Sequence, residues 1–244
     1  YSFTPHSDLN ERSIPTHFPS QNAKRSVVEQ RAFSKVTGAP VAYWLSNAVR
    51  DAFYGSHPLS ARTPVKVGLQ TGKNDRFVRY WWEISSAGFG RGVNDREEAQ
   101  SSGAKWFPYN KGGGFRKWYG NNLYVVNWLD DGAEIRQHKS SAVKNTEFYF
   151  RPSVTWSFIG DSLAARYSEA GAIFDVGGSS AFPAPKDHLW TTGMLCASPV
   201  TAFMEALNPT LNFQAGNVGS LPIPVLDASA RAQIESGASR LIEI

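Results

Sequence analysis

Two glycine-rich turns carry clusters of basic, amide and aromatic side chains, which are the residue types that contact nucleic acid. The first cluster surrounds the turn at 71–74 and comprises Lys73, Asn74, Arg76 and Arg79. Lysine and arginine neutralise phosphates, and asparagine and arginine form paired hydrogen bonds with base edges. We therefore expect this turn to approach a DNA duplex.

The second cluster surrounds the glycine triplet at 112–114. Its predicted contact residues are Lys111, Arg116, Lys117, Tyr119 and Asn121. We expect Arg116 and Lys117 to contact phosphates, whereas Asn74 and Arg76 of the first cluster position the duplex or contact base edges. Glycine lets a backbone approach a ligand closely, which suits the same role.

A structural role is the alternative for these residues. The aromatic side chains can form the core and the cations a solvated rim, and Trp106, Trp118 and Trp128 each fit a core position. Asn74 and Phe77 can equally build a turn and fill the space beneath it. The residue types alone leave both roles open.

Residues for catalysis are not grouped in the sequence. The five histidines are scattered, and no two have the spacing of metal ligands on one helix or loop. The chain has no Gly-x-Ser-x-Gly motif, no phosphate-binding loop ending in Lys-Ser/Thr, and no Rossmann spacing at 112–114. The acidic residues Asp130, Asp131 and Glu134 follow a predicted strand and indicate a solvated turn. We predict no catalytic residue, metal site or cofactor site in this chain.

Composition favours a folded protein with a polyanionic partner. Of the 244 residues, 41% are hydrophobic and 19% charged, which is typical of folded, soluble proteins. The net charge of +4 and the pI of about 9.2 suit a nucleic-acid-binding domain. Cys196 is the single cysteine, so no disulfide framework can form. No signal peptide or membrane-spanning apolar stretch is visible, so we expect a cytoplasmic protein that contacts no membrane.

The hydrophobic pattern predicts an α+β fold. Runs of β-branched and aromatic residues between glycine-rich turns predict strands at 64–69, 77–84, 123–128, 147–150, 155–158 and 172–176. The polar segment 88–103 is expected to be a surface loop.

The helices are predicted mainly from their caps and from apolar runs. Ser46 and Asp227 are favourable N-cap residues, so helices are expected at 47–53 and from 228 onward. Two further helices are expected at 188–196 and 199–206. The segment 221–224 must be extended, because each proline biases the residue before it away from helix.

The motifs now described resemble a known family. The segment 68–77 is similar to the Gly-x-x-Thr-Gly-x-Asn-x-x-Phe motif in recognition domains of type IIG restriction-modification enzymes. The block 105–128 resembles the PglX family, the adenine-specific DNA methyltransferases of bacterial phage-exclusion (BREX) systems. The segments 38–46, 207–214 and 221–224 fit the same family. The resemblance covers roughly residues 30–226.

The resemblance implies a division of labour between two domains. In this family an upstream domain binds S-adenosylmethionine and methylates a flipped adenine through an Asn-Pro-Pro-Tyr-type motif. A downstream target-recognition domain, similar to those of type I specificity subunits, reads double-stranded DNA. In this chain the segment 208–211 shares only the first two residues of the catalytic motif and lies in the wrong region. The fragment alone is therefore expected neither to bind the cofactor nor to methylate DNA.

The resemblance also predicts the domain layout. We expect an N-terminal arm or linker at 1–30, a target-recognition domain at 31–226 and the start of a spacer helix at 227–244. Such a domain has a twisted, mainly antiparallel β-sheet with packed helices. The chain begins with Tyr1 and not with methionine, so we expect it to be a fragment. Its partners are then double-stranded DNA, the catalytic domain of the parent chain and other defence-system subunits.

Two other functions compete with DNA recognition. A protein-interaction module fits the aromatic-rich surface, which can dock partner subunits or an acidic inhibitor in a defence complex. A carbohydrate-binding domain also uses tryptophan and tyrosine platforms, but sugar sites need few cations. The grouping of lysine and arginine favours DNA over sugar. The target base sequence cannot be read from these residues.

Overall fold

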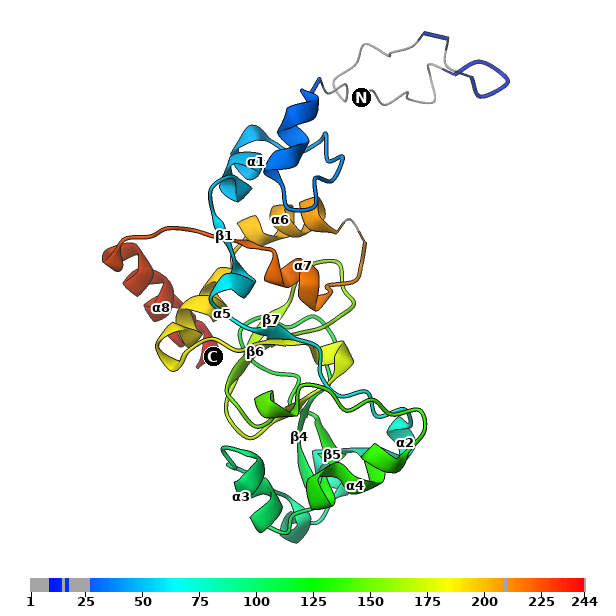
Figure 1. The fold of residues 1–244 in the computed structure, drawn as a ribbon, viewed down its shortest axis with the longest axis vertical. Helices are drawn as coiled ribbons and strands as arrows, with labels where there is room; N and C mark the ends of the chain where they lie inside the picture. The colour runs from blue at the N-terminus through cyan, green and yellow to red at the C-terminus, as the bar shows by residue number, and fades with distance from the viewer. Residues whose placement is uncertain (1–8, 15, 18–26, 209, 244) are drawn as a thin grey trace. The chain divides into compact units, whose positions relative to one another are not determined.

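The computed structural model describes residues 9–14, 16–17, 27–208 and 210–243. The chain divides into two compact units, Tyr1–Ser56 and His57–Ile244 (Figure 1). The predicted arm at 1–30 falls largely on residues 1–8, 15 and 18–26, which lie outside the described part of the chain. The predicted sites lie in the second unit.

The first unit contains a short 3-10 helix, Gln30–Lys35, and the helix α1, Asn47–Phe53. Ser46 caps α1 by accepting a hydrogen bond from the backbone N–H of Val49 at 3.3 Å, which confirms the helix predicted from this residue. An ion pair between Lys35 and Asp51 at 2.7 Å joins the two helices.

One four-stranded sheet of the second unit has the order β3-β5-β4-β8. Its strands are β3 (Val78–Tyr80), β5 (Tyr124–Asn127), β4 (Trp106–Asn110) and β8 (Ile173–Phe174). The first three are antiparallel neighbours, and β8 runs parallel to β4. The short helices α2 (Asn74–Phe77), α3 (Arg96–Ser101) and α4 (Leu129–Gln137) lie around it (Figure 1).

A second four-stranded sheet has the order β2-β9-β6-β7 and is antiparallel throughout. Its strands are β2 (Val65–Lys66), β9 (Ser180–Ala181), β6 (Ser153–Trp156) and β7 (Ala165–Ser168). The helices α5 (His188–Cys196), α6 (Pro199–Leu207) and α7 (Ala215–Gly219) contribute to the core beside this sheet. A third, two-stranded pairing joins β1 (His57–Pro58) to β10 (Pro222–Ile223).

Each four-stranded sheet has its own hydrophobic core. Phe77, Phe107 and Phe174 belong to the core of the first sheet, and Trp156 and Leu195 to that of the second. Both cores are rich in fully buried large side chains, which contribute most of the stability that apolar burial supplies. The predicted α+β class with mainly antiparallel strands is confirmed, with the strands divided between these sheets.

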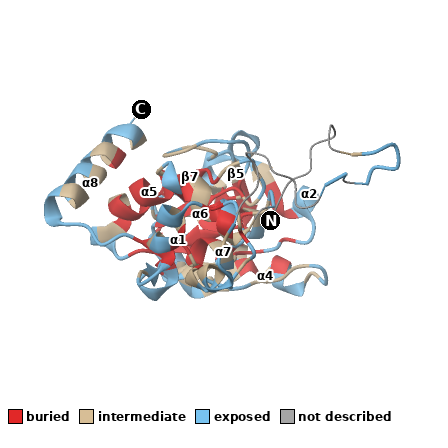
Figure 2. Cartoon of the chain, turned by 90° about the horizontal axis from the view of Figure 1, so that it is seen from above, coloured by how far each residue is buried: buried red, intermediate tan, exposed pale blue. Residues whose placement is uncertain are grey.

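The last helix, α8 (Ala228–Ile242), packs along α5. Asp227 caps it by accepting from the backbone N–H of Ala230 at 2.7 Å, as predicted. Arg231 of α8 forms an ion pair with Asp187 at 2.6 Å, and its guanidinium group lies over the ring of Trp190. Figure 2 shows that α5 is almost wholly buried, whereas much of α8 is exposed.

Three segments predicted as strand or loop contain helical turns in the structure, and the strands predicted at 64–69 and 155–158 are observed at Val65–Lys66 and Ser153–Trp156. The strand at 77–84 ends at Tyr80, because the chain turns into a 3-10 helix in which the Glu83 carboxylate accepts from the Tyr80 backbone at 2.7 Å. The loop at 88–103 contains α3, whose Asp95 cap accepts from the backbone of Glu98 at 2.8 Å. The strand at 147–150 is a 3-10 helix, Thr146–Phe148, followed by Phe150 at positive φ.

Among the described residues, no helix is long and apolar enough to cross a membrane.

We predict that lowering the pH below about 6.5 destabilises the protein partly through His188. Burial lowers the pKa of this histidine, while a hydrogen bond from its Nε2 to the Ser153 carbonyl at 2.8 Å opposes the shift. The unfolded chain then gains a proton that the folded chain does not, so stability is present above the unfolded pKa and is lost as pH falls toward the folded one. Denaturation of wild type and His188→Gln across pH 4.5–8 should show a smaller acid loss in the variant, by up to about 1.4 kcal/mol per unit of pKa shift. Equal losses in both proteins would exclude this role.

We also predict that Cys196 reacts with thiol reagents only when the protein unfolds. Burial raises the pKa of its thiol to about 11, and Sγ lies 3.1 Å from the carbonyl oxygen of Ala165. Little thiolate, the reactive form, is therefore present at pH 8. Labelling should be slow in buffer and fast in denaturant, which makes this single cysteine a check on the folding of every variant below. Rapid labelling under native conditions would contradict the buried placement.

Candidate nucleic-acid interface

The segment 68–77 is fixed against the first sheet. The backbone N–H of Leu69 donates to the Phe174 carbonyl at 2.8 Å, and a Cβ at Gly68 would lie only 1.9 Å from that oxygen. Asn74 begins α2, and its Oδ1 accepts from the Thr71 hydroxyl at 2.6 Å. Phe77 is fully buried. The predicted turn is therefore a turn followed by a short helix.

The two predicted clusters meet at Lys111, directly after β4. Its Nζ donates to Asn74 Oδ1 at 3.2 Å and lies 3.6 Å from the carboxylate of Asp175. Since Lys111 and Asn74 are 37 positions apart in the sequence, this contact is made only by the fold. It places Lys111, the first residue of the second cluster, beside Asn74 of the first cluster.

Asp175 is the buried group on which this junction depends, with an exposed fraction of 4%. Its carboxylate accepts from the Tyr109 hydroxyl and from the backbone N–H of Gly177, the latter at 2.6 Å. Burial, reinforced by this carboxylate, raises the pKa of Tyr109 well above its ordinary value, so the phenol remains a donor. Asp175 carries no distinguishing signal in the sequence, because only tertiary contacts reveal its role.

The glycine triplet allows the loop to cross another segment of backbone. Gly112 has a φ of +87°, and a Cβ there would lie 2.4 Å from the Gly177 carbonyl oxygen. The sequence suggested that a ligand approaches the glycine backbone closely, but at Gly112 that space is occupied by the Gly177 carbonyl of the same chain. Beyond the triplet, Asn121 closes the loop by donating from Nδ2 to the Gly114 carbonyl at 2.8 Å.

Hydrogen bonds join the loop 115–119 to the second sheet and to α5. The Trp118 backbone N–H donates to Ala165 at 2.9 Å, and Lys117 Nζ donates to the Cys196 carbonyl at 3.1 Å, at the C-terminal end of α5. Arg166 Nη1 donates to the Arg116 carbonyl at 3.3 Å. The loop is therefore anchored at successive residues.

Arg166 is a buried cation that sequence reasoning missed. Its exposed fraction is 1%, and its Nη1 also donates to Ser157 Oγ at 3.2 Å and the Ala164 carbonyl at 3.0 Å. Within the described part of the chain it makes no ion pair with a carboxylate. Burial lowers its pKa to about 10, which still leaves it positively charged at pH 7.

The side chains of the remaining predicted contact residues differ in whether they already form hydrogen bonds or ion pairs within the chain. Arg76 pairs with Glu134 at 3.2 Å, and Arg79 donates to the carbonyl of its own neighbour Val78 and to that of Asp75, both at 2.7 Å. Lys73, Arg116 and Tyr119 are exposed, and the side chains of the two cations make no hydrogen bond or ion pair within the described residues. These three are thus available to a ligand.

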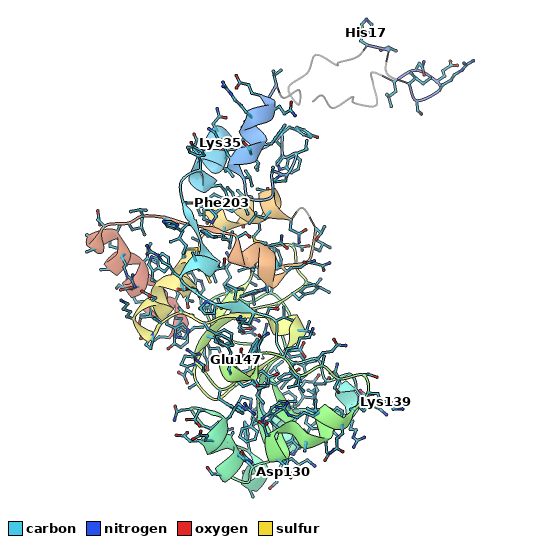
Figure 3. All side chains as sticks on the ribbon, in the orientation of Figure 1. His17, Lys35, Asp130, Lys139, Glu147 and Phe203 are labelled. Carbon is cyan, nitrogen blue, oxygen red and sulfur yellow. The ribbon has the colours of Figure 1, made fainter. Side chains whose placement is uncertain are left out.

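The acidic residues after β5 form an ion-pair cluster. Asp131 binds Arg96 at 2.5 Å and Arg136 at 2.9 Å, in a turn where Asp130 and Asp131 both have positive φ. Asp130 lies at the end of the second unit that carries α3 and α4, and Lys139 lies beside α2 (Figure 3). In the described part of the chain no group of histidine, cysteine or acidic residues could hold a metal ion.

Two hollows flank the loop 115–122. The first, which we call the aromatic cleft, has a volume of about 460 Å³ and is walled by Trp81, Phe89, Tyr119, Tyr124 and Tyr167. The second is a shallow surface that the whole loop forms with Leu241 of α8. Sequence reasoning placed Tyr119 at the site but did not foresee the cleft, whose walls come from four separate segments.

Comparison with known proteins identifies relatives for most of the chain. The adenine-specific methyltransferase PglX of Lacticaseibacillus casei (strain Zhang) is 36% identical over 209 residues, and the adenine-specific methyltransferase BrxX of Escherichia coli O9:H4 (strain HS) is 35% identical over 199 residues. Each match covers 80% of this chain but only 17% and 16% of the respective relative, so the chain spans about a sixth of their length. No family model matches the chain. The resemblance to the PglX family is confirmed.

We predict that Asp175→Asn destabilises the second unit by about 2 kcal/mol. The amide offers one acceptor oxygen where the carboxylate offers two, so the Tyr109 hydroxyl and the Gly177 N–H cannot both keep their acceptors, and Lys111 loses its ion pair. Urea denaturation should reveal the loss, with Asp161→Asn on the exposed surface as the matched control. A loss of stability no larger than that of the control would show that the junction does not depend on this carboxylate.

Proposed function

Because this chain is homologous to a segment of adenine-specific methyltransferases, we propose that it is the domain with which such an enzyme recognises double-stranded DNA. The recognition domain comprises residues 31–226, and the helix after Asp227 begins a spacer. The parent protein is then an S-adenosylmethionine-dependent DNA methyltransferase of a bacterial phage-defence (BREX) or restriction-modification system, acting in the cytoplasm. The catalytic domain would be a separate part of that protein.

The observation that carries this proposal is the junction of the two predicted clusters. Lys111 bridges Asn74 and Asp175, so the start of the loop after β4 and the start of α2 are joined at this residue. Exposed Lys73 and Arg116 lie on these two segments, where they can neutralise phosphates. Homology alone supports a relationship to adenine-specific methyltransferases. The cations on these segments support the proposal that this part of the protein reads DNA.

Three of the predicted residues have distinct parts in the proposed contact. Arg116 binds phosphate, because its guanidinium is exposed while its carbonyl is fixed by Arg166. Lys117 donates one of its three ammonium N–H groups to the Cys196 carbonyl and keeps its charge near the loop. Asn74 accepts hydrogen bonds at Oδ1, which leaves its amide donors for the duplex.

A docking role for other proteins is the second candidate. Phe115 is 64% exposed on the loop and Trp82 is 55% exposed near β3, and large exposed aromatic side chains are common at interfaces. A partner subunit or an acidic inhibitor that occupied the same cations would compete with DNA. Tight partner binding without salt-dependent DNA binding would favour this candidate.

We predict that the chain binds random-sequence duplex DNA at low salt and that Arg116→Ala weakens this binding. Each phosphate contact releases counterions, so the logarithm of the binding constant should fall linearly with the logarithm of salt concentration. Loss of one contact should reduce the magnitude of this slope by about 0.9. Fluorescence anisotropy across a salt series measures both quantities.

Arg62→Ala is the matched control, because Arg62 is an exposed arginine after a 3-10 helix that carries no predicted contact. An equal effect of both substitutions would indicate non-specific attraction by net charge. Absence of duplex binding at low salt, for a chain whose cysteine remains protected, would overturn the proposal.

A further inference from the structure

The aromatic cleft lies between the two four-stranded sheets. Its lining includes Tyr109 and Asn110 of β4, Tyr124 of β5 and Tyr167 of β7, together with Tyr119 and Trp81. Every lining residue belongs to the second unit. The volume of about 460 Å³ lies in the range of sites for small ligands.

The rings at the cleft are held rigidly. Tyr124 stacks on Tyr80 with 5.0 Å between ring centroids, and Tyr80 stacks on Trp82 at 4.6 Å. Tyr167 stacks on buried His188 at 4.1 Å. Rings already fixed by such packing lose little conformational entropy on binding a further flat group.

Polar groups lie beside these rings. Asn110 donates from Nδ2 to Ser168 Oγ at 2.8 Å, and both line the cleft with the exposed amide of Asn122. Arg91 lies with its guanidinium carbon 4.6 Å from the ring centroid of Phe89 at the same cleft. The lining thus combines ring faces, amide and hydroxyl groups, the Arg91 cation and the exposed carboxylate of Glu169.

This combination matches a nucleotide better than an apolar side chain. A base presents two flat faces for stacking and a polar edge for hydrogen bonds, and its phosphate suits a nearby arginine. An apolar peptide side chain would leave the amides and the guanidinium unused. The cleft also adjoins the proposed duplex surface, because Tyr119 and Asn122 line both hollows.

We propose that the aromatic cleft binds an unpaired nucleobase of DNA held on the adjoining loop surface. The inference rests on the proposed function and adds a second mode of contact to it: the cations hold the paired backbone, and the cleft stacks on a base that has left the duplex. A mismatched base leaves the stack at the lowest cost, so the cleft favours duplexes that contain one.

The test uses two tryptophans of similar exposure, one in each unit. Trp81 and Trp44 are 45% and 48% exposed, but only Trp81 lines the cleft. The full chain, Trp81→Ala and Trp44→Ala are titrated with a fully paired duplex and with the same duplex carrying a central run of unpaired thymines. Protection of Cys196 confirms that each variant is folded.

We expect the wild type to bind the duplex with unpaired bases about tenfold more tightly than the paired duplex, since one stacked base contributes a factor of that order. Trp81→Ala should lose this preference and Trp44→Ala should retain it. The cleft assignment would be overturned if the wild type showed no preference, if Trp81→Ala kept the full preference, or if both variants lost it equally.

The outcomes separate this inference from the proposed function. Salt-dependent binding of paired duplex without any preference leaves duplex recognition standing and removes the cleft. Binding of the unpaired probe alone, lost in Trp81→Ala, retains the cleft and removes duplex recognition. Absence of binding to either probe removes both.

Discussion

The buried carboxylate of Asp175 is the constraint on which the arrangement of the proposed surface depends. A carboxylate that is 4% exposed must have its oxygens satisfied, and here Tyr109 and the Gly177 backbone do so. The Asp175 backbone N–H also donates to Asn110 at 2.9 Å, and the residue forms a bridge with Leu69. The end of β4, the segment 68–77 and the chain after β8 are therefore fixed at one point, and Lys111 joins that point to Asn74 at the surface.

Arg166 complements this junction from the second sheet. Its guanidinium holds the Arg116 carbonyl, while Lys117 holds the end of α5, so both cations stabilise the loop whose outer side chains are proposed to contact DNA. A buried cation without a carboxylate partner among the described ion pairs costs stability. It also adds positive potential beneath the loop, and a low-dielectric surrounding weakens that field less than water would. The same guanidinium group of Arg166 therefore both holds the loop backbone and contributes positive potential beneath it.

The helices could be predicted because their N-cap residues act locally. The central contacts of the candidate site could not be predicted, because they join segments that are distant in the sequence. Ser46 and Asp227 act within one helical turn, so α1 and the start of α8 follow from sequence. The strand predicted at 77–84 was wrong beyond Tyr80, because a Glu83 hydrogen bond to the backbone overrides the aromatic pattern. The two basic clusters were visible as residue types, whereas Lys111 meeting Asn74, the role of Asp175 and the burial of Arg166 are set by pairings between distant segments. The aromatic cleft was invisible for the same reason.

The structure assigns different constraints to neighbouring residues of the segments 68–77 and 105–128. Gly68 and Gly112 touch backbone so closely that any side chain would displace it, and Phe77 fills the core. The side chains of Lys73 and Arg116 are exposed and make no hydrogen bond or ion pair among the described residues, so their replacement breaks no such interaction. A recognition surface must change its base contacts without losing its fold, and separating the buried junction from the exposed positions makes that possible. In the proposed recognition role, the segments 68–77 and 105–128 support the surface, and the side chains that project from them are the part that can differ between targets.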